Sequence, residues 1–284
     1  MQRQKSFQNN KATLYVIATP IGNLGEISKR TLEAINDSEA IFCEDTRVTG
    51  MLLSHLDIKK PLISAYENIE RKSLEKVFEY LDGGKNVAFM SDAGYPGISD
   101  PGSIIIKEVI ARDYNVVVVN GPSALIQSVL ASGFSTDHFY FYGFLNPKES
   151  KRKAELTKLK DFDDTIIFYQ SPHKILACLN DMLEILGDRN VCLCRELTKK
   201  FEEYIRGTIS EIIPICESLK GEMVLVVEGN KKKETVELTD DIIEEIESVI
   251  NNKNIKPKEA IKEVAERYNL SKNELYQAYV ERKK

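Results

Sequence analysis

Short, uninterrupted apolar runs alternate with segments of helical periodicity along most of the chain. The runs Leu14–Ala18, Ala40–Cys43 and Val87–Met90 are each followed by apolar residues at helical spacing. Continuous apolar runs of this length are typical of strands buried on both faces, and strands that alternate with helices pair mainly in parallel. The alternation therefore predicts an α/β fold built on mainly parallel sheets.

A break near Gly133–Thr136 separates two such alternating sets, which indicates two α/β domains. Strands of the second set are expected at His138–Tyr142, Thr165–Tyr169, Val191–Arg195 and Met223–Val227. We expect a mobile tail (1–12), an N-terminal α/β domain (13–135), a C-terminal α/β domain (136–230) and a helical appendage (231–284).

The appendage has only helical patterns. Pro257 is expected to start its second helix, and Ser271 with Glu274 resembles the capping box of a third helix, which carries Leu275 and Tyr279 on its inner face. This succession resembles a helix-turn-helix. Residues 231–284 contain twelve basic and twelve acidic residues, however. No DNA partner is therefore expected, and a packing or substrate-docking role is at least as well supported.

The composition narrows the possible classes of protein. The formal net charge is −5, which argues against a general electrostatic binder of nucleic acid but not against a local basic face that contacts RNA. No apolar run is long enough to span a membrane, and no signal peptide is recognisable, so we expect a cytoplasmic protein. The five cysteines are scattered without metal-site spacing, and no metal is expected.

Loops rich in glycine and proline follow several of the expected strands. The longest, Ser91–Gly102, contains Gly94, Gly97 and Gly102 with two prolines, which permit backbone conformations closed to other residues. Ligands of parallel α/β sheets bind at the carboxyl ends of the strands. Small residues there let a ligand approach the backbone, and Asp92 and Asp100 supply carboxylates. We interpret the loop as part of a ligand site; a structural turn with two solvated aspartates is the alternative.

These loops together resemble those of one enzyme family. The segments are Thr19–Leu24, Glu44–Arg47, Ser91–Gly102, Gly121–Ala124, Gly143–Leu145, Arg195–Lys199 and Gly221–Glu222. They closely resemble the ribosomal RNA small subunit methyltransferase I family of tetrapyrrole-methylase-like enzymes. The resemblance implies two α/β domains with S-adenosylmethionine between them, usually in a homodimer. It also implies methylation of the ribose 2′-oxygen of a cytidine in 16S ribosomal RNA within the small ribosomal subunit.

With this resemblance, we expect the small-residue loops to form the cofactor pocket. The expected lining residues are Pro20, Ile21, Asp92, Ala93, Gly94, Tyr95, Pro96, Ser123 and Ala124 from the first domain, and Tyr169 and Met223 from the second.

A ribose hydroxyl is a weak nucleophile and requires a proton acceptor or a polarising contact. The candidates are Glu44, Asp45, Asp100, Glu196 and Lys199. We assign catalytic roles to Asp100, Glu196 and Lys199. The alternative is that Glu196 and Lys199 form a stabilising ion-pair network with Arg195.

For RNA contact, Arg47 and Arg195 are the first candidates, since a guanidinium binds phosphate through two hydrogen bonds. The helix Lys148–Lys160 carries Lys151, Arg152 and Lys153, either as an RNA-binding patch or as an ordinary solvated face. Two other functions stay open: a methylase of a small, tetrapyrrole-type molecule, and a non-catalytic RNA-binding factor in ribosome assembly.

Overall fold

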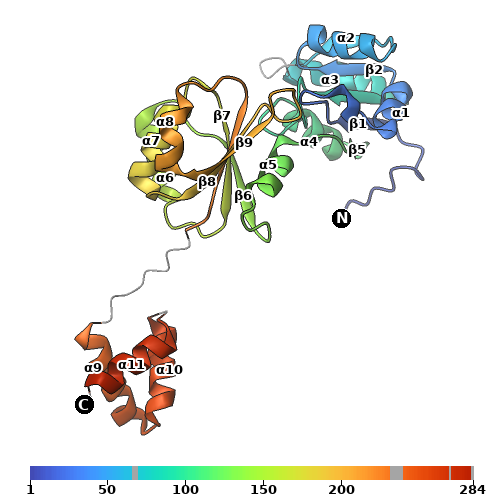
Figure 1. Cartoon of the computed structure of the whole chain (residues 1–284). Coiled ribbons are helices and arrows are strands. Elements are labelled where there is room, and N and C mark those ends of the chain that lie inside the picture. The colour runs from blue at the N-terminus through green and yellow to red at the C-terminus, as the bar shows by residue number, and fades with distance from the viewer. Residues whose placement is uncertain (66–69, 231–238, 269, 283–284) are drawn as a thin grey trace. The chain divides into compact units, whose positions relative to one another are not determined.

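The computed structural model describes residues 1–65, 70–230, 239–268 and 270–282. Two compact units follow one another along the chain, Met1–Gly229 and Asn230–Lys284. The first unit contains two five-stranded sheets, one formed by β1–β5 and the other by β6–β10 (Figure 1). The α/β fold class expected from the alternation is confirmed.

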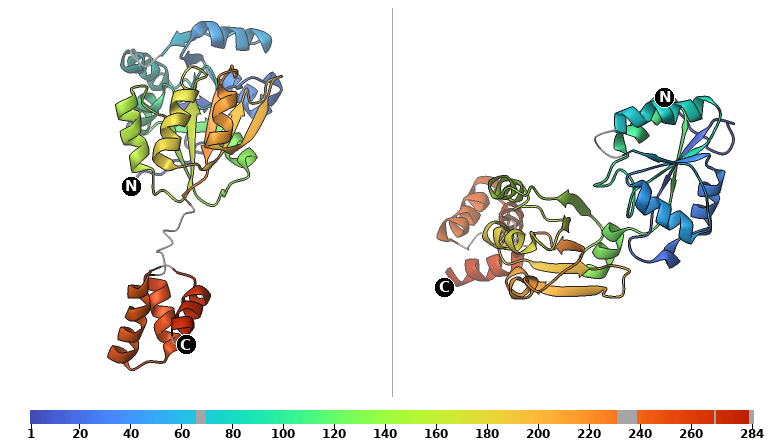
Figure 2. Two further views of the ribbon diagram at one scale, coloured as in Figure 1. Left: turned by 60° about the vertical axis from the view of Figure 1, so that its left-hand side comes forward. Right: turned by 90° about the horizontal axis from the view of Figure 1, so that it is seen from above.

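The first sheet is entirely parallel, with strand order β3-β2-β4-β1-β5. Its strands are β1 (Thr13–Ile17), β2 (Ala40–Cys43), β3 (Leu62–Ser64), β4 (Val87–Met90) and β5 (Asn115–Val119). The helices α1 (Lys29–Asp37) and α2 (Thr46–His55) pack on one face, and α3 (Glu70–Asp82) and α4 (Ser103–Ala111) on the other (Figure 2). Because both faces are covered, β2 and β4 are buried along their whole length, as their unbroken apolar sequences predict.

The second sheet has the order β6-β7-β10-β8-β9. Its strands are β6 (Phe139–Phe144), β7 (Thr165–Gln170), β8 (Asn190–Arg195), β9 (Glu203–Thr208) and β10 (Met223–Val227). Only β6 and β7 pair in parallel, while β10 is antiparallel to both β7 and β8, and β9 is antiparallel to β8. The prediction of mainly parallel pairing is therefore wrong for this sheet. The strands β7 and β8, joined through a helix, do run in one direction, but β10 inserts between them and β9 folds back through a loop.

Helices cover both faces of the second sheet as well. The helices α6 (Glu149–Lys158), α7 (Ile175–Leu186) and α8 (Ile209–Cys216) form its larger core. The opposite face is covered by α5 (Ala124–Ser132), whose Val129 belongs to the cluster that contains Cys194 and Val226. Although α5 precedes the expected boundary at residue 135, it packs on the second sheet. The chain thus leaves the first sheet at Ser123, which caps this helix by accepting a hydrogen bond from the Ile126 amide.

The second unit has a core of its own. It contains α9 (Asp240–Lys253), α10 (Pro257–Arg267) and α11 (Lys272–Arg282), which enclose Ile246, Val264, Leu275 and Tyr279. Two predictions are confirmed: α10 starts at Pro257, and Leu275 and Tyr279 of α11 point into the core. The Ser271 hydroxyl accepts a hydrogen bond from the Glu274 amide at 3.5 Å, which is one half of the expected capping box. The start of the expected appendage, 231–238, lies outside the described residues.

Candidate active site

A pocket of about 220 Å³ lies where the loops of the first sheet meet the second sheet. Its lining residues are Ile21, Ala93, Gly94, Tyr95, Ile98, Ser99, Asp100, Ser123, Ala124, Leu125, Phe144, Tyr169, Gln170, Cys194, Leu197, Glu222, Met223 and Val224. The structure thus brings together most of the residues expected at the cofactor, from segments more than a hundred positions apart. Pro20, Asp92 and Pro96 are not among the residues that line it.

Backbone hydrogen bonds join the loop Ser91–Gly102 to the loop that follows β1, beneath this pocket. The Thr19 amide donates to the Gly94 carbonyl at 2.9 Å, and the Gly94 amide donates back to the Thr19 carbonyl at 3.1 Å. Gly94 has φ +80°, a conformation that residues with a side chain rarely adopt. The glycine therefore sets the path of the backbone beneath the pocket.

Tyr95 connects the same loop to the one that precedes α5. Its hydroxyl accepts a hydrogen bond from the Gly121 amide at 3.1 Å and lies 3.3 Å from the Gly121 carbonyl. The loops around Gly94 and Ser123 are thereby held together, so the wall of the pocket is built by tertiary contacts rather than by one segment.

Asp100 is the acidic side chain of the pocket wall that is best suited to proton transfer. It is half-buried, and it makes no hydrogen bond or ion pair with the part of the chain that the structure describes. Desolvation raises the pKa of its carboxyl to about 6, and the neighbouring charges of Glu44 and Asp92 add to the shift. A carboxylate with this pKa accepts a proton near neutral pH and is a suitable general base.

Glu196 and Lys199 form a second polar cluster at the edge of the pocket. The Lys199 ammonium lies 3.0 Å from Glu196 Oε1 and 2.7 Å from Glu222 Oε2. Glu196 Oε1 also accepts from the Glu222 amide at 2.9 Å, and Glu196 has φ +50°. Of these three residues, only Glu222 belongs to the pocket lining.

The charge states of this cluster follow from its contacts. Desolvation acts to lower the pKa of Lys199, but the hydrogen bonds and charges of Glu222 and Glu196 outweigh it and raise that pKa. The pKa of Glu196 is lowered, chiefly by the Glu222 amide. Lys199 therefore stays protonated and is poorly suited as a base, whereas it can orient a negatively polarised oxygen. The cluster has the geometry of the ion-pair network considered above as the alternative, with Glu222 in place of Arg195.

The candidate phosphate ligands near the pocket differ in availability. The Arg47 side chain is 86% exposed, and it forms an ion pair with Asp45 at 2.6 Å at the start of α2. Arg195 is more enclosed: Nε lies 2.9 Å from Glu203 Oε2, and Nη1 donates to the Lys220 carbonyl at 3.0 Å. Arg47 is therefore the freer of the two guanidinium groups.

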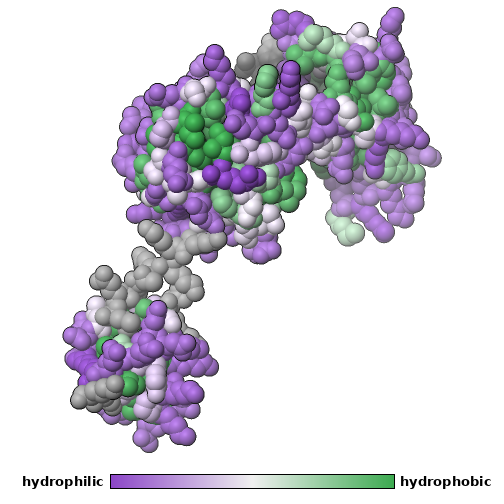
Figure 3. All heavy atoms as spheres, in the orientation of Figure 1, coloured by the Kyte–Doolittle hydropathy of each residue, from purple (hydrophilic) through white to green (hydrophobic). Residues whose placement is uncertain are grey.

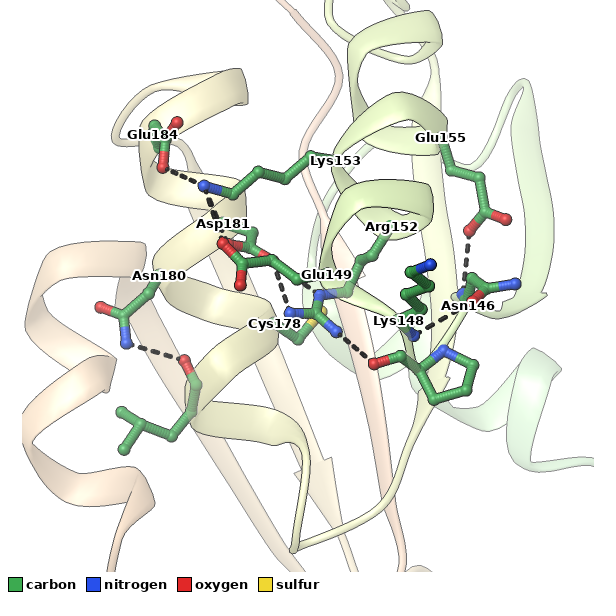
Figure 4. Close-up of polar contacts among 12 residues, drawn as sticks. Asn146, Lys148, Glu149, Arg152, Lys153, Glu155, Cys178, Asn180, Asp181 and Glu184 are labelled. Atoms are coloured by element: carbon green, nitrogen blue, oxygen red, sulfur yellow. Dashed lines mark hydrogen bonds and ion pairs between the residues drawn. The ribbon is translucent and has the colours of Figure 1, made fainter.

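The three basic residues of α6 do not share one environment. Figure 4 shows the Arg152 side chain pointing from α6 to Asp181 on α7. Arg152 Nη2 lies 2.6 Å from Asp181 Oδ2, and each of the two side chains is 8% exposed. Lys153 lies 2.8 Å from Glu184 and 3.2 Å from Glu149. Arg152 thus holds two helices together and is buried away from any external phosphate, which corrects the prediction that it faces RNA. Lys151 is exposed.

Nine lining residues of the pocket were not among the expected cofactor and catalytic residues: Ile98, Ser99, Leu125, Phe144, Gln170, Cys194, Leu197, Glu222 and Val224. Five of them, Ile98, Ser99, Phe144, Leu197 and Glu222, lie inside the loop segments that carry the family resemblance. Their position in these segments was the one sequence feature that could have identified them. An apolar or acidic side chain is by itself equally typical of the core or of the surface.

In the described part of the chain, no cluster of His, Cys, Asp and Glu side chains has the geometry of a metal site. Among the same residues, no helix combines the length and the apolar character needed to cross a bilayer.

Comparison with known proteins relates this chain to methyltransferases. The profile of the family "Tetrapyrrole (Corrin/Porphyrin) Methylases" matches residues 13–213. Ribosomal RNA small subunit methyltransferase I of Bacillus subtilis (strain 168) is 42% identical over 288 residues, which cover 98% of both proteins. The protein of that name from Haemophilus influenzae is 40% identical over 270 residues, covering 93% of this chain and 95% of its own.

Solved structures with this fold include the methyltransferase CobJ, with a TM-score of 0.58 at 14% identity, covering 77% of this chain and 95% of that chain. Uroporphyrin-III C-methyl transferase from Thermus thermophilus, complexed with S-adenyl homocysteine, has a TM-score of 0.53 at 13% identity. The match covers 76% of this chain and 97% of that chain. At this level of identity the two structures are evidence of a common fold alone.

Proposed function

This chain belongs to the ribosomal RNA small subunit methyltransferase I family, and on that premise we propose that it methylates the ribose 2′-hydroxyl of a cytidine in 16S ribosomal RNA. The methyl donor is S-adenosylmethionine, and the substrate is the small ribosomal subunit in the cytoplasm. Identity along nearly the whole chain supports ribosomal RNA as the substrate. The choice of cytidine and of the 2′-oxygen is our proposal, made from the resemblance of the loop segments.

The residues of the pocket fit the proposed cofactor. Ala93, Gly94 and Ala124 leave room beside the backbone, and the positive φ of Gly94 turns the chain where a larger residue is strained. Half-buried Tyr169 and buried Met223 supply apolar surface from the second sheet. When bound, S-adenosylmethionine supplies a methyl group activated by a sulfonium charge.

Asp100 is the group that removes the proton of the ribose hydroxyl. Its half-buried carboxylate in the pocket wall, with a pKa of about 6, is the single observation that carries this assignment. The proton passes from the 2′-oxygen to a carboxylate oxygen of Asp100. General-base action of this kind contributes about 10²- to 10⁴-fold to a rate.

Glu196 and Lys199 serve as positioning groups. The Glu196 carboxylate holds the Lys199 ammonium and the Glu222 amide together at the pocket edge. A permanently charged ammonium there attracts the 2′-oxygen as its proton leaves. Arg47 and Lys151 are the exposed cations that we assign to the phosphates of the RNA, with Arg195 in a supporting position.

Labelled methyl transfer to purified small subunits, followed by digestion to nucleosides, tests this function. Label in 2′-O-methylcytidine is the expected result. Label in a base or in another nucleoside would overturn the assignment of position. Cofactor binding without label in RNA would favour a small-molecule methylase or a non-catalytic assembly factor.

We include a homodimer in the proposal, as the resemblance implies. Figure 3 shows apolar surface over α5, where Ile126 and Leu130 are 45% and 65% exposed. A second copy of the chain is a suitable cover for this surface. Light scattering at the mass of a dimer is expected, and Leu130→Glu should shift it toward a monomer; a monomeric wild-type protein would contradict this part.

A further inference from the structure

Two large apolar side chains stand exposed on the rim of the active-site pocket. Phe144 is 60% exposed and Ile98 is 42% exposed, whereas Leu197 and Met223 in the same lining are 6% and 3% exposed. Phe144 comes from the end of β6 and Ile98 from the loop Ser91–Gly102. Apolar surface that is left open beside a catalytic carboxylate is a candidate contact for substrate.

The position of Phe144 is set by the end of β6 and its contact with the loop Ser91–Gly102. The pairing of β6 with β7 has an irregularity between Phe141 and Gly143, and Gly143 has φ +82°. A Cβ atom on Gly143 would lie 3.3 Å from the Ser99 hydroxyl oxygen, so the strand end abuts the loop at the residue after Ile98. Phe144 and Ile98 therefore flank one contact between the two halves of the first unit.

The ring of Phe144 is supported by Tyr169 and still keeps most of its surface in solvent. The two ring centroids are 5.5 Å apart at an interplanar angle of 66°, and Tyr169 is supported in turn by Phe141 at 4.9 Å and 67°. Edge-to-face packing of this kind fixes a ring without covering both of its faces. Phe144 is thus a firmly placed, accessible aromatic platform.

We propose that Phe144 stacks on the nucleobase of the target nucleotide, with Ile98 bordering the same slot. Proteins bind unpaired RNA bases by stacking them on aromatic side chains. A base held there brings its own ribose to the pocket that contains Asp100, two residues from Ile98. The inference rests on the proposed function, because it assigns the contact that positions the RNA substrate of that reaction.

Steady-state methylation of small subunits by Phe144→Ala, Phe144→Leu and Phe144→Trp tests the stacking. Phe144→Ala is expected to raise KM for the subunit about 10-fold or more, within the range measured for loss of one base–aromatic stack. Phe144→Trp should restore KM, and Phe144→Leu should not. Phe7→Ala, which removes an exposed phenylalanine that lines a different surface pocket, should match the wild type.

Calorimetry with S-adenosylmethionine separates base stacking from a contact with the cofactor. Its Kd should be unchanged in Phe144→Ala. A Kd that rises in parallel with KM, an unchanged KM, or full recovery by Phe144→Leu would overturn the inference. Absence of transfer by the wild-type enzyme would instead overturn the proposed function itself.

The chain contains no tryptophan, so Phe144→Trp also introduces a unique fluorescent probe. Fluorescence of this variant mixed with small subunits, after subtraction of the same mixture with wild-type enzyme, should be quenched as the base stacks. An unquenched signal from a variant with normal turnover would contradict stacking.

Discussion

We propose Asp100 as the general base of the site because burial and two neighbouring acids raise the pKa of its carboxyl to about 6. A general base acts only when deprotonated, so kcat/KM should rise with pH up to about 6 and level off above it. Asp100→Asn should lower kcat by about 10²- to 10⁴-fold. A pH–rate profile with saturating cofactor measures both effects.

Asp92→Asn provides the matched control for this assignment. The negative charge of Asp92 raises the pKa of Asp100, so its removal should move the acidic limb of the profile to lower pH. An amide oxygen still accepts the hydrogen bond that Asp92 receives from the Asp45 amide. If the acidic limb of the pH–rate profile lies at the same pH in Asp92→Asn as in the wild type, a group other than Asp100 titrates.

Gly94 provides a second test at the level of one residue. Gly94→Val places a branched side chain beneath the pocket, where a Cβ alone would lie 3.7 Å from Ile21. Cofactor affinity, measured by calorimetry, should be lost. Gly84→Val is the control, since Gly84 has φ +73° and open space around its Cβ. Both variants carry a strain of about 1–2 kcal/mol, and equal cofactor binding by both would remove Gly94 from the site.

The contact of α6 with α7 depends on the buried Arg152–Asp181 ion pair. Removal of Arg152 leaves the buried Asp181 carboxylate with only the longer, 3.7 Å contact to the Lys153 ammonium, so Arg152→Ala should lower the free energy of unfolding by about 3 kcal/mol. Lys151→Ala, its exposed neighbour, should change it by less than about 0.5 kcal/mol. Urea denaturation compares the two, and similar midpoints would contradict the structural role.

The same helix shows what local sequence leaves undecided. Lys151, Arg152 and Lys153 are consecutive cations, but a helix directs neighbouring side chains to different sides. Only the packing against α7 determines that Arg152 and Lys153 contact Asp181 while Lys151 stays exposed. Similarly, β9 was not expected because its apolar content is low, and its strand conformation depends on pairing with β8.

The two compact units should unfold independently. The three-helix core of the second unit contains no residue of the first, and every residue of the pocket lies between Ile21 and Val224. A chain that ends at Gly229 should therefore keep its melting temperature and its cofactor affinity. Calorimetry checks both, and a truncated chain that fails to fold would show that the units stabilise each other.

The sequence alone determined the α/β class, because continuous apolar runs between helical patterns have few other stable arrangements. It also indicated the loops of the site, since the glycines and prolines that shape them are local signals. Tertiary structure alone decided that β10 lies between β7 and β8, that α5 covers the second sheet, and that Phe144 and Asp100 share one pocket. Strand pairing, ion-pair partners and the pKa of a carboxyl depend on residues distant in the chain, and a local pattern does not contain them.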